Sequence, residues 1–234
     1  MKIKIRNFEF QVENDLSFWN NISKWEQYSF NILDKFLNKD SVFIDIGAWN
    51  GVLSLYASKI AYKVYSFEPD NIAYENFINN IIKNKLFNIS CSNKGISNNE
   101  GKNNFYIRTA GDSVSSLIDR QNNNYIANEI KTIETIKLSS FLLNNKINPT
   151  LIKMDIEGGE IFVIEEMKDY IKKYTPTMFI SFHPAWFPDK DNDIKNVVDI
   201  LSIYNIYNYN FTQYTKEQFI KSLNSTEHAF IFVK

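Results

Sequence analysis

Short apolar runs bounded by polar and turn residues recur along the chain and predict the strands of a buried sheet. The runs fall at 42–46, 64–67, 87–92, 150–154 and 178–182. Apolar residues spaced by three and four positions predict helices between these runs, at 52–61, 73–83, 160–173 and 194–204. Runs without polar alternation are typical of parallel strands that are covered on both faces. The alternation of strands and helices therefore favours an α/β fold with a single doubly wound, mostly parallel sheet.

The N-terminal part of the chain departs from this alternation. Residues 3–12 alternate between apolar and polar side chains and predict a small β-hairpin. Residues 16–37 have helical spacing and predict one or two amphipathic helices. We therefore expect an N-terminal hairpin and helical cap over residues 1–40, followed by the main domain over residues 41–234.

The middle and the end of the chain predict additional strands. Residues 104–108 and 130–138 read as strands, and the polar, turn-rich segment 109–128 between them predicts a long functional loop. The apolar pieces at 206–212 and 229–233 predict two closing strands, which would give the sheet an antiparallel edge.

The turn after the first central strand has the sequence Asp45-Ile-Gly-Ala-Trp-Asn-Gly51, and a predicted helix follows it at once. A strand, a glycine turn and a helix open a nucleotide-binding α/β unit. A dinucleotide fingerprint has three glycines, because the backbone must approach a pyrophosphate at the helix N-terminus. This turn has only two glycines, with the bulky Trp49 between them. We therefore expect a ligand with a ribose and no phosphate, such as S-adenosylmethionine.

Residues near this turn are expected to bind the cofactor. Asp45 is placed to hold the ammonium of the amino-acid part, directly or through water, and Gly47 leaves room for it. Glu68 lies at about the distance along the chain, roughly twenty residues, at which an acid accepts hydrogen bonds from ribose hydroxyls. The full set of expected contacts is Asp45, Gly47, Ala48, Trp49, Gly51, Glu68 and Pro69, with Asn93 and Lys94 bordering the adenine. In the structural alternatives, Gly47 and Gly51 form a plain strand-to-helix turn, and Glu68 is a surface acid before Pro69.

The composition narrows the class of protein. The chain has 234 residues, of which 44% are hydrophobic, and a net charge of −1, so we expect a sizeable core and no nucleic-acid partner. Cys91 is the only cysteine, which excludes an internal disulfide and a cysteine-based metal site. The N-terminus lacks a signal-peptide core and no apolar run is long enough to span a membrane. We therefore expect a cytoplasmic protein.

Three stretches together resemble the FkbM-type family of S-adenosylmethionine-dependent methyltransferases. They are Val42-Phe-Ile-Asp-Ile-Gly-Ala-Trp-Asn-Gly51, Val64-Tyr-Ser-Phe-Glu-Pro-Asp70 and Leu151-Ile-Lys-Met-Asp-Ile-Glu-Gly-Gly-Glu160. The last stretch is the most specific, since methyltransferases in general lack it. The resemblance implies a class I, Rossmann-like methyltransferase fold and O-methylation, often of a sugar in a polysaccharide or a glycosylated natural product.

A further similarity concerns the N-terminal cap. Trp25-Glu26, followed by Ser29, is similar to a segment that closes over the cofactor in a subgroup of the family, although Gln27 stands where proline is usual. The resemblance therefore implies cofactor contacts for Glu26 and Ser29.

Asp155, Glu157 and His183 follow two predicted strands at their carboxyl ends, where an open α/β sheet binds its ligands. We expect His183 to be the general base, because its ordinary pKa suits proton transfer near neutrality. Asp155 would orient it, bind the acceptor hydroxyl or contact the cofactor. The same three side chains offer oxygen and imidazole ligands for Mg²⁺ or Mn²⁺. In the structural alternatives, Asp155 caps a helix, Glu157 pairs with Lys153, and His183 is an ordinary histidine at a strand end.

The function that these patterns favour is S-adenosylmethionine-dependent O-methylation of a saccharide hydroxyl. The alternatives are methylation of a non-sugar small molecule and a non-catalytic binding module with the same fold. The missing third glycine and Trp49 disfavour a nicotinamide oxidoreductase.

Overall fold

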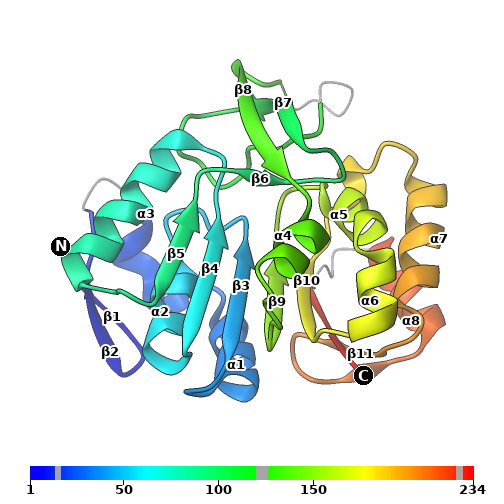
Figure 1. Cartoon of the computed structure of the whole chain (residues 1–234), viewed down its shortest axis with the longest axis horizontal. Helices are drawn as coiled ribbons and strands as arrows, with labels where there is room; N and C mark the ends of the chain where they lie inside the picture. The colour runs from blue at the N-terminus through cyan, green and yellow to red at the C-terminus, as the bar shows by residue number, and fades with distance from the viewer. Residues whose placement is uncertain (14–16, 120–125, 225–228) are drawn as a thin grey trace.

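An eight-stranded sheet forms the centre of the molecule in the computed structural model, which describes residues 1–13, 17–119, 126–224 and 229–234 (Figure 1). Its strands, in spatial order, are β12 (Gln213–Tyr214), β11 (Asn205–Asn208), β13 (Ala229–Val233), β10 (Met178–Ser181), β9 (Leu151–Met154), β3 (Val42–Ile46), β4 (Lys63–Phe67) and β5 (Ile89–Ser92). The five strands from β10 to β5 are parallel. β13 runs antiparallel to β10 and β11, and β12 runs antiparallel to β11. The expected mostly parallel sheet with an antiparallel edge is therefore confirmed.

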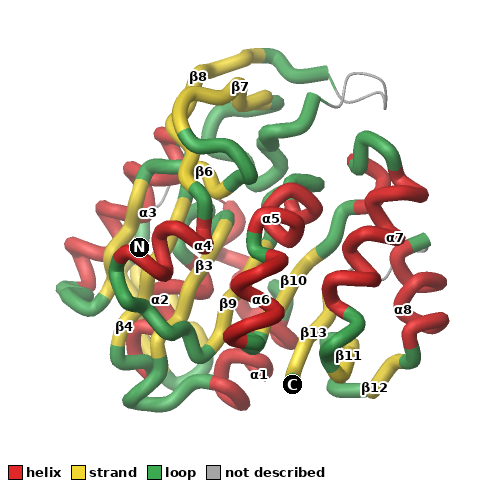
Figure 2. Tube along the Cα trace, turned by 45° about the vertical axis from the view of Figure 1, so that its right-hand side comes forward, coloured by secondary structure: helices red, strands yellow, loops and turns green. Residues whose placement is uncertain are grey.

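Helices cover both faces of this sheet (Figures 1 and 2). They are η1 (Ser17–Lys24, a 3-10 helix), α1 (Gln27–Phe36), α2 (Val52–Ile60), α3 (Asn71–Asn84), α4 (Leu138–Asn144), α5 (Glu160–Glu166), α6 (Lys168–Tyr174), η3 (Pro184–Trp186, a 3-10 helix), α7 (Lys190–Leu201) and α8 (Lys216–Leu223). Among the described residues, none of the helices has the length and apolarity that a membrane crossing needs. Asp70 is the N-cap of α3, and its side chain accepts hydrogen bonds from two backbone N–H groups of the first turn.

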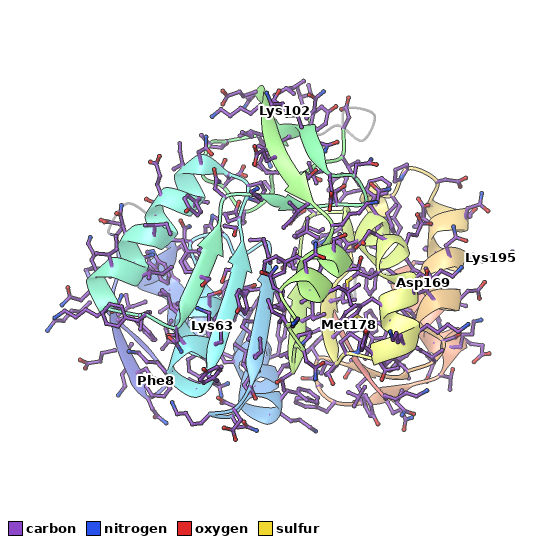
Figure 3. All side chains as sticks on the ribbon, viewed as in Figure 1. Phe8, Lys63, Lys102, Asp169, Met178 and Lys195 are labelled. Atoms are coloured by element: carbon purple, nitrogen blue, oxygen red, sulfur yellow. The ribbon has the colours of Figure 1, made fainter. Side chains whose placement is uncertain are left out.

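Alternate residues of each strand supply two hydrophobic cores, because successive side chains point to opposite faces. Ile44 and Ile152 belong to the core under α4 to α8, whereas Phe43 and Leu151 belong to the core under α1 to α3. Figure 3 shows that side chains such as Met178 fill the space between sheet and helices, while Lys195 projects outward.

The described part of the first 40 residues packs on the second of these faces. The hairpin of β1 (Lys2–Ile5) and β2 (Phe8–Gln11) is confirmed, and its apolar side chains join the core formed by Phe43 and Leu151. The N-terminal segment therefore covers the face of the sheet toward which Asp45 and Lys153 also point, by the same alternation along β3 and β9.

Three expectations differ from the structure. The expected strands at 104–108 and 130–138 do not join the main sheet, because β7 (Gly101–Ile107) and β8 (Glu129–Ile136) form a separate three-stranded sheet with β6 (Gly95–Ile96). Figure 1 shows this small sheet above the carboxyl ends of the parallel strands. The single helix expected at 160–173 is two helices separated at Met167. The strand expected at 206–212 is shorter, and both β12 and α8 lie between it and β13 in the sequence.

The strand order reverses beside β3. The chain runs outward from β3 through β4 to β5, and then returns to place β9 on the other side of β3. In an open α/β sheet, ligands bind outside the carboxyl ends of the strands at such a switch point. The ends of β3 and β9 are therefore the expected floor of a site.

Candidate active site

A cavity of about 730 Å³ opens at this switch point, and its volume is within the range of roughly 300–1,000 Å³ that is usual for small-molecule sites. One part of its wall is aromatic and comes largely from the N-terminal segment: Phe18, Trp25, Tyr28, Trp49 and Tyr209. The other part is charged: Glu26, Asp45, Lys153, Asp155, Glu157 and His183. Apolar surface with a few converging polar groups is typical of a site that binds an organic ligand.

Asp45 and Lys153 form a buried ion pair at the floor of this cavity. They are register partners on β3 and β9, and Lys153 Nζ lies 3.5 Å from Asp45 Oδ1. Lys153 also donates a hydrogen bond of 2.9 Å to the carbonyl of Gly47, and Ser54 donates one of 2.6 Å to Asp45 Oδ2. Burial lowers the pKa of Lys153, but the charges of Asp45, Asp155 and Glu26 outweigh it and raise this pKa. Lys153 is therefore a fixed cation beside the cavity.

Gly47 is required by the close approach of the two strand ends. A Cβ at this position would lie 2.0 Å from the carbonyl oxygen of Asp155, and the residue has φ +73°. Gly51 was also expected to contact the cofactor, but it lines neither of the two cavities at this end of the sheet. It lies against the ring of Phe77, and a Cβ at position 51 would come within 2.0 Å of that ring. The geometry explains Gly51 by packing.

A smaller cavity of about 50 Å³ adjoins the first and shares Gly47, Trp49, Asp155 and Glu157 with it. Glu68, Pro69 and Lys94 line this cavity, whereas Asn93 donates hydrogen bonds to the carbonyls of Glu68 and Pro69 behind it. Ala48 lines the larger cavity.

Glu68 is buried, and its carboxylate organises the turn around it. Its two oxygens accept hydrogen bonds from the backbone N–H groups of Trp49, at 2.7 Å, and Asp70, at 2.8 Å. Burial raises the pKa of Glu68 to about 7, against the opposing effect of these hydrogen bonds. The carboxyl therefore changes charge near neutral pH, which an exposed surface acid would not do.

The N-terminal segment brings Glu26 into the larger cavity. Ser29 is buried and donates a hydrogen bond of 3.0 Å to Glu26 Oε2, so it acts through Glu26 rather than from the wall itself. Burial, together with the charge of Asp155, raises the pKa of Glu26.

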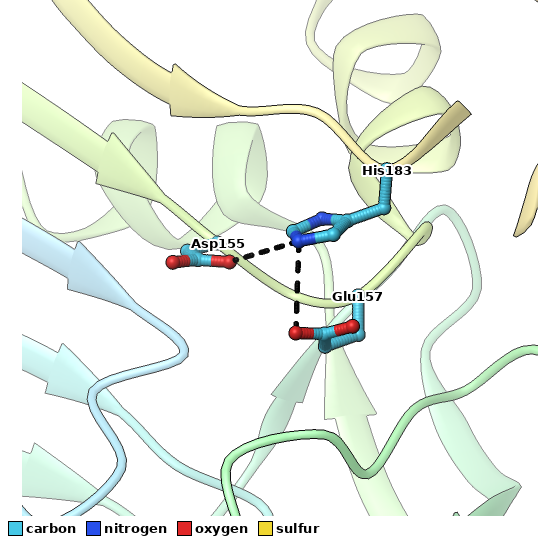
Figure 4. A group of neighbouring side chains, drawn as sticks. All are labelled: Asp155, Glu157 and His183. Carbon is cyan, nitrogen blue, oxygen red and sulfur yellow. Dashed lines mark ion pairs between the residues drawn. The ribbon is translucent and has the colours of Figure 1, made fainter. Parts of the chain in front are cut away.

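Asp155, Glu157 and His183 meet at the rim, as Figure 4 shows. His183 Nε2 lies 3.7 Å from Asp155 Oδ1 and 3.6 Å from Glu157 Oε1. The other ring nitrogen, Nδ1, lies 3.1 Å from Oε1 of the fully buried Glu160. The alternative in which Glu157 pairs with Lys153 is wrong, because Lys153 pairs with Asp45. The alternative in which Asp155 caps α5 is also wrong, because the N-cap is Gly159 and no side-chain cap is formed there.

The environment of His183 changes its expected protonation. Burial lowers its pKa, but the charge and hydrogen bond of Glu160 and the charges of Asp155 and Glu157 raise it to about 10. In the ligand-free protein His183 is therefore an imidazolium near neutral pH, and the ordinary pKa that favoured it as the general base does not apply.

Part of the expected functional loop contributes to the site, whereas residues 120–125 lie outside the described residues. Ser113 lines both cavities, the carbonyl of Gly111 accepts a hydrogen bond of 2.8 Å from Trp49 Nε1, and Ser116 donates one of 2.8 Å to the carbonyl of Glu157.

Sequence reasoning did not assign functional roles to Lys153, Glu160, Tyr28 or Tyr209. Lys153 and Glu160 stand in the Lys-x-Asp-x-Glu-Gly-Gly-Glu stretch, so the signal for these two was present. Tyr28 and Tyr209 are single aromatic residues in helical and turn segments and carried no such signal.

Comparison with known proteins agrees with the fold. None of the curated proteins matches the chain. Among solved structures, the chain is similar to the methyltransferase FkbM from Methylobacillus flagellatus KT, with 17% identity, a TM-score of 0.50, and coverage of 92% of this chain and 59% of that one. It is also similar to Precorrin-6y C5,15-methyltransferase from Geobacter metallireducens GS-15, with 14% identity, a TM-score of 0.49, and coverage of 99% and 98%. The chain thus spans about three fifths of the length of the first structure, and that likeness concerns the fold alone.

The sequence matches the family described as Methyltransferase FkbM domain over residues 45–211. This match covers more than half of the chain and extends from β3 into the segment after β11. It includes both the Asp45–Lys153 pair and the group of Asp155, Glu157 and His183. The chain therefore belongs to the FkbM methyltransferase family, a family of S-adenosylmethionine-dependent methyltransferases.

Proposed function

We propose that the protein transfers the methyl group of S-adenosylmethionine to a hydroxyl group of a saccharide. The observation that carries the proposal is that acids suited to the methyl donor and acids suited to a hydroxyl acceptor border the same cavity, at the switch point of the sheet. The family membership supports the donor.

In this proposal the cofactor extends across both cavities. The ribose hydroxyls donate hydrogen bonds to Glu68 in the smaller cavity, where Lys94 and Pro69 also lie. The amino-acid part lies over Gly47 in the larger cavity, with its ammonium directed to the carboxylates of Asp45 and Glu26. The excess of carboxylates over cations in this wall favours a cofactor with a sulfonium and an ammonium group.

The acceptor occupies the remainder of the larger cavity. Its hydroxyls are proposed to bind Asp155 and Glu157, because carboxylates accept hydrogen bonds from hydroxyl groups. The aromatic rings on the opposite wall, among them Tyr28 and Tyr209, offer flat apolar faces for the ring of a sugar. Aromatic faces combined with a few polar groups suit a ligand that has both apolar and hydroxyl surface.

The reaction is an in-line displacement. The acceptor oxygen forms a bond to the methyl carbon while the carbon–sulfur bond breaks, and the electron pair of that bond stays on sulfur to give S-adenosylhomocysteine. The hydroxyl proton must leave during this step, and a positioned base assists it. His183 is already protonated near neutral pH and therefore cannot accept the hydroxyl proton. We assign the first contact with the hydroxyl to the carboxylates of Asp155 and Glu157, with His183 beside them. Holding the oxygen at attack distance and excluding water are the main contributions of the protein.

The test has a binding part and a catalytic part. S-adenosylhomocysteine should raise the melting temperature, and NAD should not, because a ligand that binds the native state stabilises it. Incubation with S-adenosylmethionine and a panel of sugars, nucleotide-sugars and polysaccharide fragments should give a product heavier by one methylene unit in mass spectrometry. Glu157→Gln should lower kcat about 100-fold while S-adenosylhomocysteine still binds.

Two outcomes contradict the proposal at different levels. Without stabilisation by S-adenosylhomocysteine, the cofactor assignment fails. With stabilisation but methylation of non-sugar hydroxyl compounds only, the saccharide assignment fails and the methyl transfer stands.

A further inference from the structure

Asp155, Glu157 and His183 converge from two neighbouring strand ends on one point of the cavity wall. Asp155 follows β9, Glu157 lies in the turn after it, and His183 follows β10, which pairs with β9. One ligand atom from each of the three side chains lies within 4.8 Å of the others. Two carboxylate oxygens and one imidazole nitrogen are a ligand set that divalent cations accept.

The imidazole is held in the orientation that a metal ligand needs. Glu160 is fully buried and fixes Nδ1 of His183 at 3.1 Å, so Nε2 is directed toward the two carboxylates (Figure 4). Glu160 is itself held by the backbone N–H groups of Ile156, at 3.1 Å, and Gly158, at 3.0 Å from its second oxygen. A carboxylate behind the second ring nitrogen is the usual support of a metal-binding histidine.

The same carboxylate also fixes the turn that carries Glu157. Ile156 and Gly158 flank Glu157 on both sides, and Glu157 has φ +57°. The backbone contacts of Glu160 therefore set the positions of two of the three candidate ligands, Glu157 and His183, from one buried group.

The distances from His183 Nε2 to the two carboxylates are longer than direct hydrogen bonds. His183 Nε2 lies 3.6 Å from Glu157 Oε1 and 3.7 Å from Asp155 Oδ1, whereas an N–H···O hydrogen bond is about 2.7–3.2 Å long. Adjacent ligand atoms of an octahedral ion with bonds of about 2.1 Å lie roughly 3 Å apart. Small side-chain movements, on the order of 1 Å or less, would therefore bring the three atoms into coordination.

We propose that Asp155, Glu157 and His183 bind one divalent cation, Mg²⁺ or Mn²⁺, and that Glu160 is the positioning residue of this site. Oxygen and nitrogen ligands without sulfur favour these ions. All three residues line the larger cavity, so an ion bound by them would be accessible from it. The role of the ion in catalysis rests on the proposed function: Asp155 and Glu157 would then hold the acceptor hydroxyl through the ion, which would lower the pKa of that hydroxyl and orient it toward the methyl donor. Cation binding itself does not rest on it.

Metal binding is measured directly on the full chain. The protein is treated with EDTA, desalted and titrated with MnCl₂, and free Mn²⁺ is followed by electron paramagnetic resonance. We expect one saturable site, which Mg²⁺ competes for. Glu157→Gln and Asp155→Asn should weaken Mn²⁺ binding at least about tenfold, and Glu160→Gln should weaken it about 10- to 100-fold. Glu165→Gln is the matched control, because Glu165 lies on the same helix as Glu160 outside the cavity and should leave Mn²⁺ binding unchanged.

The outcomes separate this inference from the proposed function. No saturable Mn²⁺ site, or equal binding by the wild type and Glu157→Gln, overturns the metal site. Calorimetry with S-adenosylhomocysteine on the same metal-free protein shows whether the cofactor site is intact. Cofactor binding without Mn²⁺ binding refutes the metal site, and methyl transfer that persists undiminished in EDTA refutes the catalytic role of the ion. Both results leave the methyltransferase assignment standing.

Discussion

Replacing Lys153 by methionine is the change that most directly tests the floor of the site. Lys153 is 7% exposed and Asp45 is 1% exposed. Their charged atoms lie 3.5 Å apart, and Lys153 also donates to the carbonyl of Gly47. Methionine is similar in length and apolar, so Lys153→Met removes the cation with little loss of packing and leaves Asp45 as a buried carboxylate with only Ser54 as its hydrogen-bond donor.

The expected cost is large compared with the stability of a domain. Removing one partner of a buried ion pair typically destabilises by about 3–5 kcal/mol, because the remaining charge is buried without compensation. The loss of the hydrogen bond to Gly47 acts on the same groups and is not additive with this figure. We therefore expect Lys153→Met to lower the free energy of unfolding by about 3–5 kcal/mol out of a total of roughly 5–15 kcal/mol.

Urea unfolding of four proteins measures this effect: wild type, Lys153→Met, Asp45→Asn and the double variant. The double variant should be more stable than Lys153→Met alone, because the neutral amide introduced by Asp45→Asn replaces the uncompensated charge. The coupling energy between the two sites should be about 2 kcal/mol or more. A loss below about 1 kcal/mol for Lys153→Met, or strictly additive effects at an unchanged m-value, would refute the buried pair as a source of stability.

Two further predictions concern the turn and the acid expected to bind ribose. Gly47→Ala places a Cβ 2.0 Å from the Asp155 carbonyl oxygen, so urea unfolding should show a loss of stability about 2 kcal/mol larger than for Gly101→Ala. Gly101 is the control, because it also has a positive φ but a Cβ there would have no atom within 4 Å. Equal losses for the two variants would show that φ alone determines the cost. Because the pKa of Glu68 is raised to about 7 and ribose hydroxyls need the ionised form as acceptor, the affinity for S-adenosylhomocysteine should rise about tenfold from pH 6 to pH 8. Calorimetry at both values should find no such rise for Glu68→Gln, and a pH-independent wild type would contradict the ribose role.

The parts of the fold that depend on local pattern were predictable. Apart from Asp45, the run Val42–Ile46 is apolar on both faces, which is typical of a central strand covered on both sides. The helix over Asn71–Asn84 combines apolar spacing with an acid at its N-cap. The helix break at Met167 was not predictable, because the apolar spacing continues across it from Ile164 to Ile171.

The parts that depend on pairing between distant segments were not predictable. β7 and β8 pair with each other in a small separate sheet rather than at the edge of the main sheet, and their own alternation is compatible with both arrangements. The partner of Lys153 is likewise set by the register of β3 against β9, two strands that are far apart in the sequence. The sequence places Glu160 in the Lys-x-Asp-x-Glu-Gly-Gly-Glu stretch, but only the position of His183 in the fold shows which group its buried carboxylate holds.

The end of β9 couples the two halves of the proposed reaction. Lys153 is the cation beside Asp45 on the cofactor side. Asp155 comes two residues later and borders the acceptor side. Its backbone carbonyl also contacts Gly47. Two residues of extended chain span only about 6–7 Å. Under the proposed function, donor and acceptor are therefore positioned by neighbouring residues of one rigid strand end, and the distance between them does not depend on a mobile loop. Methyl transfer requires the oxygen at roughly 3–3.5 Å from the methyl carbon, so a change such as Gly47→Ala, which pushes this strand end away from β3, should lower the rate of transfer more than it lowers the affinity for either ligand.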